Sequence, residues 1–65
     1  MRYFDYKSPA CEAGINDIEL ETIVKAMREE FPADEMMQEL HILRACEAIR
    51  DGHATIGDIT NRQAA

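Results

Sequence analysis

Apolar side chains recur with a helical period in two adjacent stretches of the chain. In the first stretch they form a single stripe, with spacings of three, one, three and four residues: Leu20, Ile23, Val24, Met27 and Phe31. Side chains with this spacing share one face of an α-helix. Asn16 and Glu19 match a capping box, and Pro32 disfavours helical conformation in the residue before it. The pattern therefore predicts a helix over residues 16–31.

The second stretch carries two apolar stripes on one predicted helix, residues 34–51. One stripe consists of Met36, Leu40 and Leu43, and the other consists of Ile42, Cys46 and Ile49. Asp34 is the predicted N-cap, and Gly52 suits the left-handed position after the last turn. The short connection at Pro32 makes the two helices antiparallel neighbours. Because the first helix covers only one stripe, we expect the other to be a dimer interface that builds a four-helix bundle, formed by Ile42, Cys46 and Ile49.

The segments on either side of this helical hairpin have weaker patterns. Residues 1–14 sustain no apolar period and contain Pro9 and Gly14, so we expect an irregular N-terminal arm. This arm holds most of the aromatic side chains, Tyr3, Phe4 and Tyr6. Thr55 and Asp58 predict the capped start of a short third helix over residues 56–62. The predicted fold is thus all-α, with one small domain over residues 1–65.

Composition narrows the class of protein further. The 65 residues carry a formal charge of −6, and 46% of them are apolar, which is too apolar for a disordered acidic tail. The acidic balance argues against nonspecific binding to nucleic acid or to anionic lipid. No apolar run approaches the roughly 20 residues of a membrane span, and the first residues lack the apolar core of a signal peptide. With only Cys11 and Cys46, we expect a cytoplasmic protein with free thiols.

Few residues could support metal binding or catalysis. Zinc sites need four converging ligands, and the available side chains lack that spacing: Cys11, His41, Cys46 and His53. A cysteine nucleophile needs a lowered pKa, whereas Cys46 lies on an apolar stripe, which raises it. We therefore expect no metal, no cofactor and no enzymatic activity.

Charge and apolar surface point instead to binding of another protein. Five carboxylates surround the predicted turn between the long helices: Glu29, Glu30, Asp34, Glu35 and Glu39. Such a cluster would steer a basic protein partner toward the chain. Apolar contacts would come from adaptable or aromatic side chains, namely Tyr3, Phe4, Tyr6, Met36 and Met37. The leading hypothesis is a regulator, adaptor or antitoxin-like inhibitor that acts by stoichiometric binding.

Two alternative functions also agree with the sequence. Residues 49–59 (IRDGHATIGDI) resemble the lead-in of helix-turn-helix and winged-helix domains, and the resemblance implies a dimeric regulator associated with DNA or RNA. A recognition helix would have to follow this segment, and only Arg50 and Arg62 lie near it to meet phosphates. The second alternative is a structural module that oligomerises or tethers subunits of a larger assembly.

Overall fold

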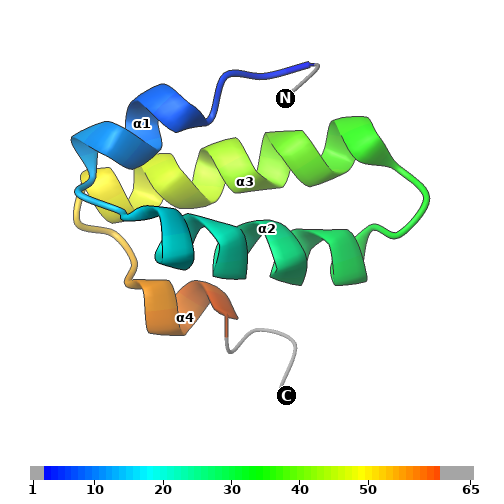
Figure 1. The fold of residues 1–65 in the computed structure, drawn as a ribbon. Coiled ribbons are helices and arrows are strands. Elements are labelled where there is room, and N and C mark those ends of the chain that lie inside the picture. Colours follow the sequence, from blue (N-terminus) through cyan, green and yellow to red (C-terminus); the bar gives the residue numbers. More distant parts are fainter. Residues whose placement is uncertain (1–2, 61–65) are drawn as a thin grey trace.

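Four helices make up the fold in the computed structural model, which describes residues 3–60 (Figure 1). In chain order they are α1 (Lys7–Glu12), α2 (Asp17–Glu30), α3 (Glu35–Arg50) and α4 (Ile56–Thr60). No strand occurs among the described residues, so the predicted all-α class is confirmed. Within the same residues, no helix combines the length and the apolar content needed to cross a membrane.

The two long helices form the predicted antiparallel hairpin (Figure 1), and side chains cap both of their N-termini. The capping box is complete: Asn16 Oδ1 accepts from the Glu19 amide at 2.8 Å, and Glu19 Oε1 accepts from the Asn16 amide at 3.0 Å. Asp34 Oδ1 accepts from the Met37 amide at 3.1 Å. The predicted ranges 16–31 and 34–51 therefore correspond to the two helices together with their cap residues.

The N-terminal segment is more ordered than the sequence pattern indicated. Asp5 Oδ1 accepts from the amides of Lys7 and Ser8 and so caps α1. Pro9 lies in the first turn of α1, where proline is tolerated. Gly14 follows the helix with φ +75°, the left-handed conformation that glycine provides after a helix. The prediction of an irregular arm is therefore wrong for residues 7–12, because its two apparent breaks sit where a short helix accepts them.

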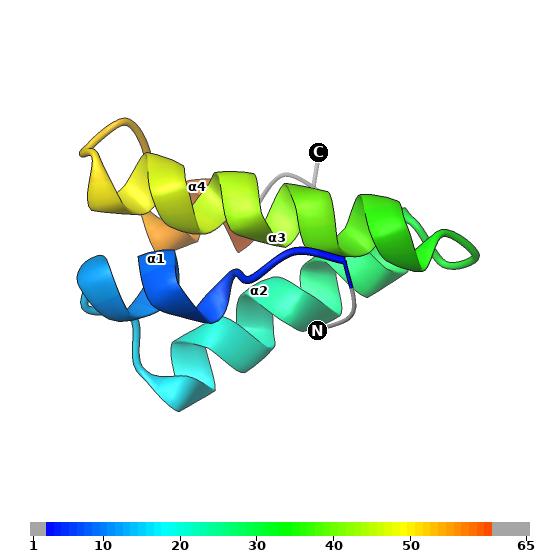
Figure 2. The ribbon, with the colours of Figure 1, turned by 90° about the horizontal axis from the view of Figure 1, so that it is seen from above.

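The helices pack in pairs around the hairpin. The extended residues 3–6 and then α1 run beside α3, while α4 lies against α2 (Figures 1 and 2). We refer to residues 3–12 as the N-terminal strap. The short helix α4 starts with the predicted cap, since Thr55 and Asp58 exchange hydrogen bonds between side chain and backbone at 3.0 and 3.1 Å. Positions 61 and 62 of the predicted helix lie outside the described residues.

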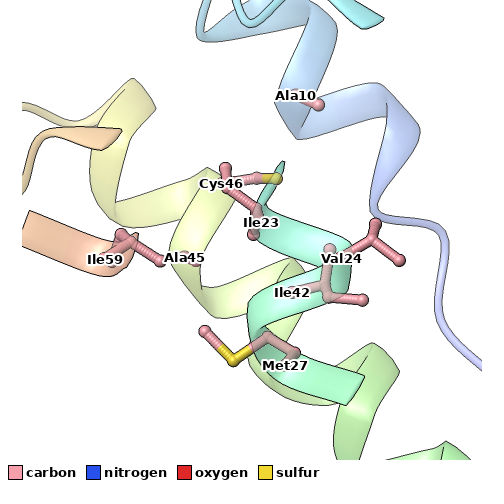
Figure 3. Close-up of a cluster of buried hydrophobic side chains, with 8 residues drawn as sticks. All are labelled: Ala10, Ile23, Val24, Met27, Ile42, Ala45, Cys46 and Ile59. Atoms are coloured by element: carbon pink, nitrogen blue, oxygen red, sulfur yellow. The ribbon is translucent and has the colours of Figure 1, made fainter. Parts of the chain in front are cut away.

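All four helices contribute to one core. Its buried side chains are Ala10, Ile23, Val24, Met27, Ile42, Ala45, Cys46 and Ile59 (Figure 3). Ile42 is 2% exposed and Cys46 is 0% exposed, while Ile49 is partly buried and packs against the core. This corrects the expected interface, because the stripe assigned to a second subunit is covered within a single chain. Dimerisation itself stays a prediction.

The capping box yields a test of the hairpin. Asn16→Ala removes the acceptor for the Glu19 amide, so we expect the free energy of unfolding to fall by about 1 kcal/mol. Asn16→Asp keeps an acceptor oxygen and serves as the matched control. Chemical denaturation measures both variants, and equal losses for the two would contradict the assigned cap.

Candidate docking surface on α3

The outer face of α3 carries a partly exposed apolar stripe that does not join the core cluster. Helical geometry places Leu40 about 160° around the axis from Ile42. Met36 and Leu43 lie one turn away from Leu40 on either side, and Met37 lies next to Met36. None of these four side chains belongs to the core or to the apolar residues packed against it. Met36 is 48% exposed, and the other three are half-buried.

The structure thus reverses the expected roles of the two stripes on α3. The apolar pattern predicted that one stripe would pack on α2 and that Ile42, Cys46 and Ile49 would contact a second subunit. In the structure the latter stripe faces the core, and the stripe centred on Leu40 faces outward. A sequence signal for this choice exists: exposed Arg44 and half-buried Glu47 follow Leu40 and Leu43 by one turn on the outer side. Charged side chains favour the solvated face of a helix.

An acidic turn adjoins the N-terminal end of this outer face. Four of the five predicted carboxylates are exposed around the turn between α2 and α3: Glu29, Glu30, Asp34 and Glu35. The turn is held closed, because Gln38 Nε2 donates to the Phe31 carbonyl at 2.6 Å. The Phe31 ring also stacks on His41, with ring centroids 4.5 Å apart. The acidic side chains are therefore presented from a fixed turn beside Met36 and Met37.

Glu39, the fifth predicted carboxylate, has a different role. Its side chain is only 5% exposed. Glu39 Oε1 accepts from the backbone amides of Tyr3 at 2.7 Å and of Phe4 at 3.0 Å. Burying a carboxylate costs free energy unless hydrogen bonds compensate it. The prediction that Glu39 steers a partner from the surface is thus corrected: Glu39 fastens the N-terminal strap to α3.

The aromatic residues of the strap divide between surface and core. Tyr3 is 50% exposed, and Phe4 is half-buried. Tyr6 packs against the core cluster, and desolvation by burial raises the pKa of its hydroxyl. Of the three predicted aromatic contacts, Tyr3 therefore remains the most available to a partner, and Tyr6 serves the chain's own packing.

The structure places the residues considered for metal binding and for catalysis. Among the described residues, no group of three or more histidine, cysteine or acidic side chains could hold a metal ion. Burial raises the pKa of the Cys46 thiol to about 11, which disfavours the nucleophilic thiolate near neutral pH. Cys11 is exposed and unbridged.

The segment that resembles a helix-turn-helix contributes one cation within the described residues. Arg50 donates to Asp51 at 3.0 Å and to Glu12 at 3.0 Å, and these hydrogen bonds raise the pKa of its guanidinium. The ion pair with Glu12 ties α3 to the strap. Arg62, the other cation named for this hypothesis, lies outside the described residues.

Comparisons with known proteins add no family assignment. No protein-family model matches the chain, and no match was found among curated proteins or solved structures. The assignment of the outer stripe of α3 and the acidic turn as a candidate site therefore depends on the geometry of this chain alone.

Truncation of single side chains tests which stripe of α3 belongs to the core. Ile42→Ala removes buried methyl groups, and we expect the free energy of unfolding to fall by about 2–4 kcal/mol. Leu40→Ala removes a half-buried group from the outer face, with an expected loss of at most about 1 kcal/mol. Urea denaturation of both variants measures the difference. A larger loss for Leu40→Ala than for Ile42→Ala would overturn the assignment.

The buried thiol of Cys46 makes the stability of the fold decrease at alkaline pH. In the unfolded chain the thiol loses its proton near its ordinary pKa of 9.0, whereas in the folded protein the pKa is about 11. Its contribution to stability is therefore fully present below pH 9 and is lost as the pH rises toward 11. We expect Cys46→Ala to lessen the decline in stability over this range and the control Cys11→Ala to leave it unchanged. Identical pH profiles for the two variants would contradict the burial of Cys46.

Proposed function

We propose that this protein is a non-enzymatic binding module that docks a basic amphipathic helix of another protein onto the outer face of α3. The observation that carries the proposal is the partly exposed apolar stripe outside the core, formed by Met36, Met37, Leu40 and Leu43, beside a turn of exposed carboxylates. Stoichiometric binding through this surface suits a regulator, an adaptor or an inhibitor.

The spacing of the stripe suits a helical partner. Met36, Leu40 and Leu43 stand at positions i, i+4 and i+7, so they extend over about 10 Å of helix axis. Apolar anchors with this spacing are those that a second helix meets when two helices pack side by side. The methionine side chains are flexible and polarizable, which lets such a surface accept partners of differing shape.

Charge indicates the sign of the partner. The chain carries a formal charge of −6, and four of its carboxylates are exposed at the turn beside the stripe: Glu29, Glu30, Asp34 and Glu35. A negative patch at the edge of an apolar surface accelerates encounter with a positively charged partner and fixes its orientation. A helix with one apolar face and flanking lysine or arginine residues satisfies both requirements.

The raised pKa of the Cys46 thiol favours a binding function over cysteine catalysis. The buried thiol of Cys46 has a pKa raised to about 11, and catalysis by cysteine requires the opposite shift together with a nearby base. The outer stripe needs no such chemistry, because apolar burial and steering are sufficient for association.

A designed peptide tests the docking face directly. The probe is a synthetic amphipathic helix with a leucine stripe and flanking lysines, and the measurement is its affinity by titration calorimetry. Leu40→Asp should weaken binding at least about tenfold, because it places a charge at the centre of the apolar contact. The matched control is Ile18→Asp, which changes a side chain that is 80% exposed on α2, away from the stripe. Equal losses for the two variants, or no binding by the parent chain, would refute the proposal.

Charge reversal tests the steering role separately. The variant with Glu29→Lys and Glu30→Lys should associate with the same peptide more slowly at physiological ionic strength, and the difference should vanish at high salt. The control reverses the same number of charges at the other end of α2, with Asp17→Lys and Glu21→Lys. The nearest of the four positions, Glu21 and Glu29, are about 12 Å apart along the helix axis, which exceeds the Debye length of about 8 Å at physiological ionic strength. Equal on-rates for the two variants in stopped-flow measurements would exclude steering by the turn.

A further inference from the structure

The N-terminal strap lies along one face of α3 and is fastened at both ends of that face. Glu39, Cys46 and Arg50 are seven and four residues apart and therefore share a face. At one end Glu39 accepts the amides of Tyr3 and Phe4, and at the other Arg50 pairs with Glu12. Cys46 lies between these two attachments, with Ala10 of the strap in the same cluster (Figure 3). The strap is thus the cover of Cys46.

The helix of the strap contributes little apolar area to the core, although Tyr6 just before it packs against the core cluster. Within α1 only Pro9 and Ala10 are buried, and both are small. The ion pair at its far end joins side chains that are 35% and 60% exposed, and exposed ion pairs add little to stability. The strongest single attachment is therefore the buried Glu39 carboxylate, which holds the strap through its backbone.

The strap packs on α3 but is separated from α2 by a series of hollows. Two hollows of about 310 Å³ each lie between the strap and α2, and a third of about 560 Å³ lies mainly between α2 and α3 and meets the strap at Tyr6. The two smaller hollows share Lys7 and Leu20 in their linings. The largest hollow shares Tyr6 and Val24 with one of them. These hollows are open to solvent, so the strap packs closely on α3 and leaves surface grooves on its side toward α2.

We propose that the N-terminal strap is a lid that opens as a unit while the α2–α3 hairpin stays folded, and that Glu39 is its latch. Opening swings residues 3–12 away from α3 about the loop at Gly14 and uncovers the stripe that contains Ile42 and Cys46. Regions held by few buried contacts open at a lower free-energy cost than the whole fold.

The buried thiol is a built-in reporter of this opening. In a Cys11→Ser background, an aromatic disulfide reagent can react only with Cys46, which is 0% exposed in the closed state. The lid predicts that labelling in the absence of denaturant is at least about tenfold faster than global unfolding, with a weaker dependence on denaturant. Labelling that follows the global unfolding rate at every denaturant concentration would overturn the proposal.

Variants of the latch distinguish the lid from general destabilisation. Glu39→Gln keeps an acceptor oxygen but loses its charge, so the strap should be released more often. We expect a several-fold increase in the labelling rate of Cys46, with a smaller change in the global unfolding rate. Glu29→Gln, which makes the same chemical change on the exposed surface of α2, is the control. Equal acceleration of labelling and of global unfolding by Glu39→Gln would contradict a separate lid.

Hydrogen exchange provides a second readout on the unaltered chain. The amides of Ala10 and Ala13, which donate to the carbonyls of Tyr6 and Pro9, should exchange together and ahead of the amides of Ile23 and Met27 in α2. Exchange of all four amides at one common rate set by global unfolding would exclude the lid independently of any substitution.

Discussion

The fold depends on how the second apolar stripe of α3 is kept from water. A hairpin of two helices covers one side of each helix, and α3 has apolar side chains on two sides. The chain solves this with its own N-terminus: the strap lies over Cys46, and its Ala10 joins the core with Ile23 and Ile42. Transfer of such side chains from water is the main source of stability in a small domain. The buried carboxylate of Glu39 directs this cover, because it binds the strap through its backbone amides.

This use of the strap determines which surface remains for other molecules. Once Ile42 and Cys46 are directed inward, helical geometry turns Leu40 and its neighbours outward. The same orientation of α3 places Glu39 beneath the strap and leaves the other acidic residues of the turn exposed. The core, the Glu39 latch and the proposed docking face thus all follow from the orientation of α3 about its own axis.

Local signals in the sequence predicted the helices, whereas tertiary contacts decided their orientation. Asn16, Asp34 and Thr55 act within three residues of themselves, so the starts of α2, α3 and α4 were predictable. The short helix α1 was not, because Pro9 and Gly14 read as breaks until Asp5 is seen to cap it. The hydrogen bond between the Tyr3 amide and the Glu39 carboxylate spans 36 residues. The sequence around Glu39 therefore could not show whether this carboxylate binds the strap or is solvated. For the same reason Leu40 and Leu43 were not recognised as surface residues.

The central claim is that one chain covers its own Cys46 with its own α1. Isotope-filtered NMR on an equal mixture of ¹³C-labelled and unlabelled protein tests it most directly, by asking whether contacts between the Ala10 methyl group and Cys46 arise within a chain or between chains. We predict cross-peaks within one chain, because Ala10 and Cys46 of the same chain share one buried cluster. Cross-peaks found only between chains would show that a second subunit supplies the cover, and would contradict this claim.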